Sequence, residues 1–187
     1  MSYFPAMLNF NDKRVLIVGG GKIAAEKTEK ILDFTTDITI ITSQLNEKMK
    51  ALASKHKLVN YIKEYETKDV TGFDVVIVCV DNLNLQEQIF KSTRDTRAIV
   101  NSVDSPQWCD FIFPSYIKRE ELVVAVSSSS YAPALSRALR IYLDKFIPNN
   151  INSLLKKLKT IRANRPKGKE RQLELSKIVN NFFKELN

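Results

Sequence analysis

The chain of 187 residues contains one histidine, two cysteines and only five glycines. A single histidine, His56, excludes a metal centre built from several histidines, and we expect it to lie exposed at a helix end. The two cysteines, Cys79 and Cys109, lack the spacing of metal ligands. We therefore expect no protein-bound metal, and we expect both thiols to stay reduced in a cytoplasmic protein.

Long apolar runs are also missing. The longest, 75–80, falls far short of the roughly 20 residues that span a bilayer. The N-terminus lacks the basic and apolar regions of a secretory signal. An apolar content of 44% is nevertheless typical of a folded protein. These features predict a cytoplasmic protein that does not act at a membrane.

Positive charge is in excess, with Lys+Arg 29 against Asp+Glu 21 and a net charge of +8. Such a balance favours either nucleic acid or a polyanionic small molecule as a partner. Much of the excess lies in the C-terminal part, where a solvated helical face accounts for most of it. The basic residues there are Lys156, Lys157, Lys159, Arg162, Arg165, Lys167, Lys169 and Arg171.

Three of the five glycines are consecutive and follow the apolar run 15–18. Gly19, Gly21 and Ala24 have the spacing of the dinucleotide-binding fingerprint, with Ala in the third place. The first glycine permits a sharp turn, and the second lets a pyrophosphate approach the main chain at a helix N-terminus. Gly19, Gly20 and Gly21 are therefore candidate cofactor-binding residues, and the alternative is a tight turn without a ligand.

Apolar runs alternate with helical periodicities along the first hundred residues. The predicted strands are 14–18, 38–42, 58–62, 75–80 and 98–100, and the predicted helices are 22–34, 45–54 with Ser43 as candidate N-cap, and 83–93. This order predicts an α/β fold with a Rossmann-type doubly wound parallel sheet.

The pattern changes after about residue 110. Segments 111–113 and 122–126 predict two short strands of a hairpin. Pro133 opens a predicted helix that Pro148 ends, and two further helices are separated by 166–168. The first of these helices carries an apolar stripe of Leu135, Leu139, Tyr142, Leu143 and Phe146.

The residues after the second predicted strand do not decide the cofactor. An Asp or Glu that binds the ribose is expected there, but Thr42, Ser43 and Gln44 follow instead. Their polar groups can bind a ribose without rejecting a 2′-phosphate, and no Arg beside them requires one. This loop therefore does not distinguish NAD from NADP.

Two polar loops are further candidates. Asp104 follows the fifth predicted strand, where open α/β sheets bind ligands, and could serve as a general acid–base group or bind a cation. The alternative is an Asx turn before Pro106. The serines 127–130 precede Pro133 and suit carboxylate or phosphate binding, the alternative being a solvated loop with an N-cap.

Four segments together resemble the precorrin-2 dehydrogenase/sirohydrochlorin ferrochelatase module at the N-terminus of siroheme synthases. They are 18–24 with Lys27, 101–104, 109–114, and 124–128 with Pro133 and Arg137. Each is unspecific alone, but their order and intervals are specific, and the resemblance covers about residues 5–147.

The resemblance implies NAD-dependent oxidation of precorrin-2 to sirohydrochlorin in siroheme biosynthesis. In many members it also implies insertion of ferrous iron, here a further substrate. By position, Asp104 matches the family's catalytic carboxylate, and the tetrapyrrole is a polycarboxylate that a basic protein attracts. The resemblance places Lys22, Ile23, Ser43 and Gln44 in the NAD site, and candidate substrate-binding residues are Ser127, Ser128 and Arg137.

The family is a homodimer whose middle segment exchanges across the two-fold axis. The expected domains are a Rossmann domain at 1–113, a small α+β dimerisation segment at 114–147 and a C-terminal helical region at 148–187. Ser128 matches a serine that is phosphorylated in siroheme synthases, and Ser129 and Ser130 replace a usual Gly-Gly. The alternative function is a dinucleotide-sensing module whose basic helices bind nucleic acid or a protein partner, which would leave Asp104 unexplained.

Overall fold

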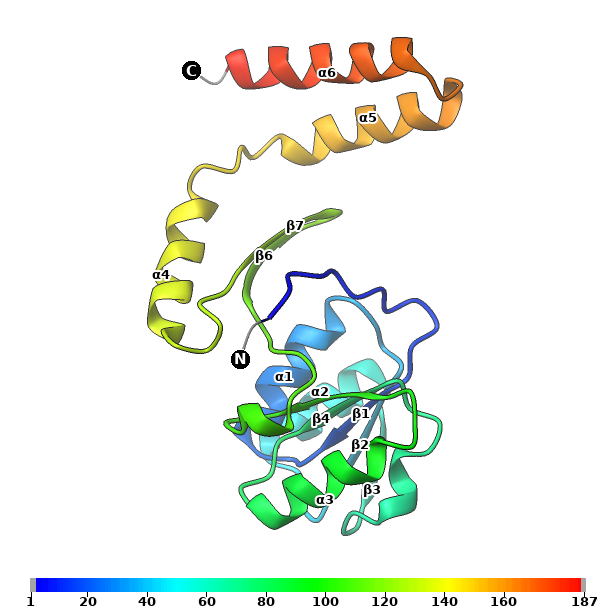
Figure 1. Ribbon diagram of the computed structural model, residues 1–187, viewed down its shortest axis with the longest axis vertical. Coiled ribbons are helices and arrows are strands. Elements are labelled where there is room, and N and C mark those ends of the chain that lie inside the picture. The colour runs from blue at the N-terminus through cyan, green and yellow to red at the C-terminus, as the bar shows by residue number, and fades with distance from the viewer. Residues whose placement is uncertain (1–2, 186–187) are drawn as a thin grey trace. The chain divides into compact units, whose positions relative to one another are not determined.

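The computed structural model describes residues 3–185, and the chain forms two compact units, residues 1–112 and 113–187 (Figure 1). Within the described residues, no helix combines the length and the apolar character that crossing a membrane would require.

The first unit is built on a parallel sheet with strand order β3-β2-β1-β4-β5. The order changes direction beside β1, and open α/β sheets bind ligands at such a crossover. This topology confirms the predicted doubly wound fold. The strands are β1 (Val15–Val18), β2 (Ile38–Thr42), β3 (Val59–Ile62), β4 (Val75–Val78) and β5 (Ile99–Ser102); the helices are α1 (Lys22–Leu32), α2 (Glu47–His56) and α3 (Leu83–Thr93), with short 3₁₀ turns η1 (Thr67–Val70) and η2 (Pro106–Trp108).

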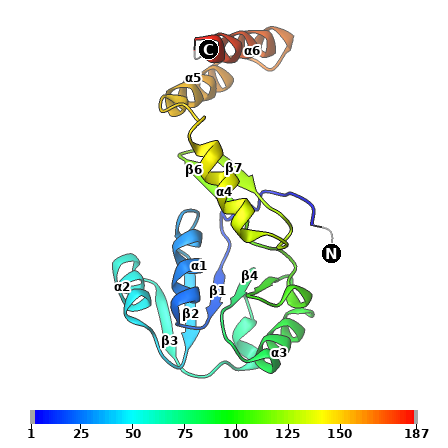
Figure 2. The ribbon, with the colours of Figure 1, turned by 90° about the vertical axis from the view of Figure 1, so that its left-hand side faces the viewer.

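Helices cover both faces of this sheet, with α1 and α2 on one side and α3 on the other (Figure 2). Val18, Val78 and Val100 pack with Ile89 of α3, whereas the alternate strand residues face α1 and α2. Residues of β1 and β4 are buried throughout, which explains why their sequences are continuous apolar runs rather than alternating ones. Each such buried aliphatic side chain contributes about 1.5–3 kcal/mol.

The N-cap of α2 is Asn46 and differs from the predicted residue. Ser43 was predicted to cap this helix, but the side chain of Asn46 does so, its Oδ1 accepting a hydrogen bond from the Met49 amide at 2.8 Å. The helix begins later because the Thr42 hydroxyl donates to the Gln44 carbonyl at 2.9 Å and closes a separate turn first. His56 ends the helix and is half-buried.

The outer edge of β5 is closed by the segment that follows it. The predicted strand at 111–113 is wrong, because the segment that follows β5 bonds to it through one backbone contact and several side chains and forms no strand ladder. Asp110 accepts the Val100 amide at 2.8 Å, and its own amide donates to the Val100 carbonyl at 2.8 Å. The Asn101 side chain donates to the Phe111 carbonyl at 2.9 Å. Arg94 holds Asp110 with two hydrogen bonds of 2.9 and 2.7 Å.

The second unit combines a hairpin with three helices. Strand β6 (Ser115–Arg119) pairs antiparallel with β7 (Leu122–Val126), and α4 (Pro133–Asp144) contacts both strands. Arg119 fixes α4 by an ion pair of 2.9 Å to Asp144 and a hydrogen bond of 3.2 Å to the Ile147 carbonyl. Helices α5 (Ile151–Asn164) and α6 (Lys169–Lys184) pack on each other. They are the two C-terminal helices that the sequence predicts.

Replacing Asp110 by Asn should destabilise the first unit. Burial raises the pKa of Asp110, but the Arg94 guanidinium and the Val100 amide lower it below the usual value overall. We expect the free energy of unfolding to fall by about 1–2 kcal/mol at neutral pH, since the pair is partly exposed. Urea unfolding of Asp110→Asn, with exposed Asp95→Asn as the matched control, measures this loss.

The pH dependence has a defined sign. A carboxyl group with a lowered pKa in the folded state stabilises the fold above its unfolded pKa of about 4, and this contribution disappears as the pH falls through the folded value. The difference between Asp110→Asn and the unsubstituted protein should therefore narrow below about pH 4. A difference in the free energy of unfolding that stays constant down to about pH 2.5, roughly 1.5 units below the unfolded pKa, would contradict this role.

Candidate functional site

The turn after β1 requires glycine at its first position. Gly19 has a backbone φ of +122°, which residues with a side chain rarely adopt. An added Cβ would also collide with the Cys79 carbonyl. Its amide donates to the Ile41 carbonyl at 2.8 Å, while the Cys79 amide donates to the Val18 carbonyl at 2.8 Å. The turn is therefore held from both neighbouring strands.

Gly20 is required by a second close approach. A Cβ there would collide with the Gln44 carbonyl and lie 2.8 Å from Thr42 Oγ1. The Gly20 carbonyl also accepts the Asn46 amide at 2.9 Å. These contacts bring together the turn after β1 and the loop after β2, which the sequence shows only as the ends of two separate strands. The exposed residue Ser43 therefore lies next to the glycine turn.

Gly21 differs from the other two because an added Cβ would meet nothing within 4 Å. It is the N-cap of α1, which has no side-chain cap and no acidic residue in its first turn. Ala24, the third fingerprint position, is fully buried, as close helix–sheet packing requires. The exposed first-turn amides and helix dipole make this end of α1 suitable for a phosphate, with Lys22 and Ile23 exposed beside it.

Asp104 lies in the turn that follows β5, two residues beyond its end. It is exposed and has a φ of +60°, a conformation that Asp tolerates better than most residues. The Val103 amide before it donates to the Val78 carbonyl at 3.0 Å, which fixes the start of the turn. No hydrogen bond of the described residues uses the Asp104 carboxylate, so the alternative of an Asx turn is not realised.

Lys27 of α1 shares this end of the sheet, a placement the sequence did not reveal. The lysine is half-buried, and burial lowers its pKa, as does the neighbouring charge of Lys30. Cys79, Asp104 and Cys109 lie near enough to the Lys27 ammonium to raise its pKa and so to oppose this shift. In the sequence, Lys27 stood out only as one residue of the segments that carry the family resemblance.

The two thiols are neutral groups of the scaffold. Burial raises the pKa of Cys79 to about 12 and also raises that of Cys109. Cys109 Sγ donates to the Ser102 carbonyl at 3.0 Å and accepts the Ser102 amide at 3.2 Å, which ties it to the β5 edge. These contacts support a structural role for Cys109 rather than a nucleophilic one.

The remaining predicted residues belong to the second unit. Ser128 Oγ accepts the Ala132 amide at 3.0 Å and lies 3.0 Å from Ser136 Oγ, so it organises the entry to α4. Ser127 is exposed, as is Arg137 on α4. Ser129 and Ser130 have φ angles of +52° and +69°, a backbone that glycine adopts without strain.

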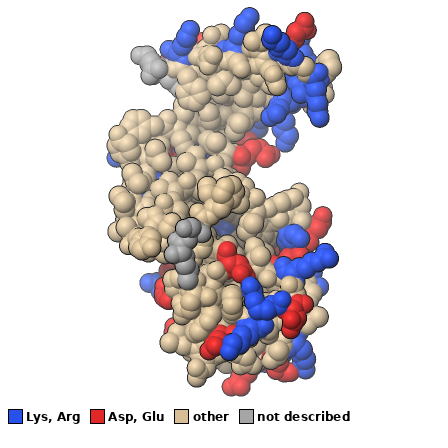
Figure 3. Space-filling model, in the orientation of Figure 1, with Lys and Arg blue, Asp and Glu red and all other residues tan. Residues whose placement is uncertain are grey.

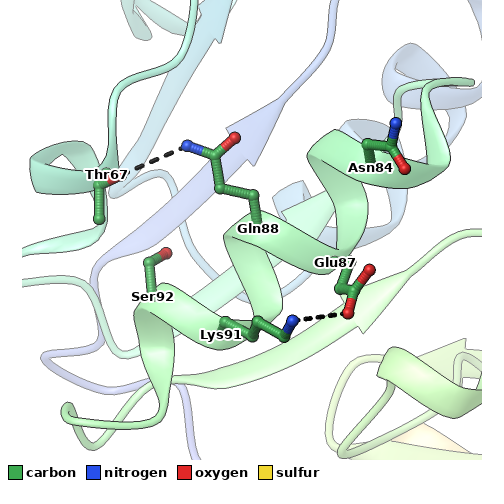
Figure 4. A pocket seen from close by; sticks show the side chains of 6 residues that line it. All are labelled: Thr67, Asn84, Glu87, Gln88, Lys91 and Ser92. Atoms are coloured by element: carbon green, nitrogen blue, oxygen red, sulfur yellow. Dashed lines mark hydrogen bonds and ion pairs between the residues drawn. The ribbon is translucent and has the colours of Figure 1, made fainter.

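A separate pocket of about 430 Å³ lies between η1 and α3 (Figure 4). It shares no residue with the glycine turn or with the Asp104 loop, and its side chains bond largely to one another, as in the Lys91–Glu87 ion pair of 2.7 Å. Its lining is Thr67, Asn84, Glu87, Gln88, Lys91 and Ser92. Within residues 3–185, no group of three or more His, Cys, Asp or Glu could hold a metal ion.

A sharp glycine turn, an uncapped helix N-terminus and a crossover beside β1 define a nucleotide-binding α/β protein. A family model described as "Putative NAD(P)-binding" matches residues 6–115. The chain belongs to this NAD(P)-binding family, and its cofactor is a nicotinamide dinucleotide.

Similar proteins agree with the resemblance inferred from the sequence. The siroheme synthase of Mannheimia succiniciproducens is 36% identical over 151 residues, which are 81% of this chain and 32% of that protein. The siroheme synthase of Neisseria meningitidis serogroup C is 34% identical over 154 residues, which are 82% and 32%. The chain thus spans about a third of the length of these relatives.

A solved structure described as "SirC, precorrin-2 dehydrogenase" has the same fold. It superposes with a TM-score of 0.80 over 95% of this chain and 89% of that chain, at 19% identity. Together with the siroheme synthases, it confirms that the family resemblance drawn from the sequence segments is correct.

The glycines should separate into structural and binding roles. Gly21→Ala should leave the melting temperature nearly unchanged, because its Cβ meets open space, yet weaken NAD binding about tenfold or more by blocking close approach of a phosphate. Gly20→Ala should instead lower the melting temperature by forcing apart the two loops. Calorimetry for binding and thermal unfolding for stability test both; unchanged NAD affinity in Gly21→Ala would refute the assignment.

Proposed function

We propose that the protein is a precorrin-2 dehydrogenase that uses NAD to form sirohydrochlorin in siroheme biosynthesis. The observation that carries the proposal is an exposed carboxylate, Asp104, at the carboxyl end of β5, in the same unit as the dinucleotide turn. The relation to siroheme synthases and the shared fold with a precorrin-2 dehydrogenase support the choice of substrate.

The proposed chemistry divides between two loops at the carboxyl end of the sheet, the glycine turn after β1 and the Asp104 turn after β5. Dehydrogenation removes a hydride and a proton from the macrocycle, and a bound NAD supplies the hydride acceptor. The main chain at Gly21 and the first turn of α1 hold the pyrophosphate. Asp104 Oδ takes the proton, for which its exposure and its position two residues beyond β5 suit it.

The choice of NAD over NADP belongs to the same proposal. Ser43 and Gln44 are exposed beside the glycine turn and offer hydroxyl and amide groups to a ribose. No Arg stands in this loop to pair with a 2′-phosphate. Rates with the two cofactors, measured at equal concentration, test this preference.

Positive charge gives the second unit a role in substrate capture. The last 40 residues contain ten Lys and Arg against three acidic residues, and these basic side chains gather over α5 and α6 (Figure 3). A polycarboxylate tetrapyrrole would be attracted by this field. Ser127, Ser128 and Arg137 are the proposed contacts at the entry to α4.

Ferrous iron insertion into sirohydrochlorin is a second activity of the proposed enzyme, with iron as a substrate. The four ring nitrogens of the macrocycle bind the metal, so no cluster of protein ligands is needed. Formation of siroheme from sirohydrochlorin and ferrous iron, followed separately from NADH formation, tests this second step.

Asp104→Asn and Asp104→Ala should abolish most dehydrogenation, because neither side chain can take the proton. General-base catalysis is worth about 10²–10⁴-fold, so kcat should fall by that amount. NAD affinity should stay within about twofold, since the glycine turn is untouched. The measurement is NADH absorbance under anaerobic conditions with precorrin-2, and Asp81→Asn, another exposed acid of this unit, is the control.

Two results would overturn the proposal. Undiminished turnover in Asp104→Ala would remove the assigned role from this residue. No NADH formation by the unsubstituted protein, combined with tight and salt-sensitive DNA binding, would favour the alternative of a dinucleotide sensor acting on nucleic acid.

A homodimer formed through residues 114–147 is part of the proposal. The apolar stripe of α4 is exposed in the single chain, with Tyr142 at 57% and Phe146 at 65% exposure. The rings of Tyr142 and Phe146 lie 4.8 Å apart between centroids at an interplanar angle of 55°, so the exposed apolar side chains contact one another. Soluble proteins rarely leave such a patch uncovered, and a second copy of this segment would bury it. Its members are Leu135, Leu139, Tyr142, Leu143 and Phe146.

Leu139→Glu should convert the dimer to a monomer, because it places a charge in the middle of this stripe. Sedimentation of the protein at micromolar concentration measures the mass directly. Ala134→Glu puts the same charge on α4 outside the stripe and should remain dimeric. A monomeric unsubstituted protein would contradict the proposed assembly without touching the assignment of Asp104.

A further inference from the structure

Lys27 is one of the residues that carry the family resemblance, and the proposed chemistry gives it no role. On α1, Ala24, Thr28 and Ile31 are buried against the sheet. Thr28 Oγ1 also lies 3.5 Å from Met49 Sδ, so α2 packs beside this stripe. Lys27 lies at the border of the buried stripe and is held half-buried.

The residues near the Lys27 ammonium show which end of the sheet it lies at. Cys79, directly after β4, and Asp104 and Cys109, after β5, lie near enough to the ammonium to affect its pKa. Lys27 therefore reaches over the carboxyl ends of β4 and β5. In an open α/β sheet this is the region where a substrate meets the cofactor.

A second buried polar group at this end is incompletely bonded. Val100 packs on the α3 side, so its neighbour Asn101 faces the α1 side, where Lys27 lies. Asn101 is 5% exposed, and its Nδ2 lies 3.6 Å from Cys109 Sγ and donates to the Phe111 carbonyl. Its Oδ1 has no hydrogen-bond partner in the described chain. Buried acceptors are normally satisfied, so Oδ1 leaves a place at this end of β5 for a hydrogen-bond donor.

We propose that the Lys27 ammonium binds a carboxylate of the tetrapyrrole and thereby places the macrocycle against Asp104. This inference rests on the proposed function, which it deepens by naming a substrate-positioning residue. A half-buried ammonium is already partly stripped of water, so an ion pair there is less screened than one at the solvated cations of α5 and α6. One cation on a rigid helix also orients the ligand, which a mobile surface charge does not.

The test compares Lys27→Met, which keeps the length of the side chain without its charge, with Lys27→Arg, which keeps the charge. Lys30→Met, one turn along α1, is the matched control. Titration with sirohydrochlorin, followed by its absorbance, measures binding without turnover. We expect about tenfold or greater weakening in Lys27→Met, near-normal binding in Lys30→Met and substantial recovery in Lys27→Arg.

Steady-state kinetics and calorimetry supply the second readout. The KM for precorrin-2 should rise in Lys27→Met more than kcat falls, and the Kd for NAD should change less than about twofold. Unchanged sirohydrochlorin binding in a folded Lys27→Met protein would overturn the inference. Loss of NAD affinity would also overturn it, because Lys27 would then serve the cofactor.

The two proposals fail separately. If the unsubstituted protein binds sirohydrochlorin through Lys27 but forms no NADH from precorrin-2, the dehydrogenase assignment fails and the carboxylate contact stands. If NADH forms normally and Lys27→Met binds and turns over like the unsubstituted protein, only the role of Lys27 fails. Thermal unfolding of each variant excludes loss of folding as the cause.

Discussion

The candidate site depends on the close approach of two backbone segments, the turn after β1 and the loop after β2. Gly20 lies so near the Gln44 carbonyl that no side chain fits between them, and the Asn46 amide closes the contact. Because the loops are pressed together, the N-terminus of α1 and the polar residues after β2 lie side by side, where the proposed dinucleotide would meet both. At Gly21 an added Cβ would meet nothing within 4 Å. The glycines thus differ: the first two are required by close backbone contacts, and the third is the one we propose for binding.

The other half of the site depends on how β5 ends. An edge strand needs partners for its amides and carbonyls. Here Asp110 and Cys109 supply them from the following segment, and Arg94 holds Asp110 in place. This keeps β5 paired up to Ser102, so the next turn presents Asp104 at a defined position. The segment 109–114, one of those that carry the family resemblance, therefore has a structural role in holding β5.

Prediction from the sequence succeeded where a pattern is local and failed where a partner lies far along the chain. Strands buried on both faces are recognisable as apolar runs, and the spacing of the glycines predicts the tight turn between β1 and α1. The cap of α2 was misassigned because a hydroxyl–carbonyl contact at Thr42 delayed the helix. The strand expected at 111–113 was wrong because Asp110 bonds β5 with its side chain, which hydropathy does not record.

The sequence by itself determined the fold class, the dinucleotide turn and the family, because each depends on residues close together or in a fixed order. Only the tertiary structure decided which glycine faces open space, that Lys27 lies near Asp104, and that Asn101 keeps an unpaired oxygen on β5. Those facts arise where α1, β4 and β5 converge. Residues separated by some 75 positions meet there, and no local pattern encodes that meeting.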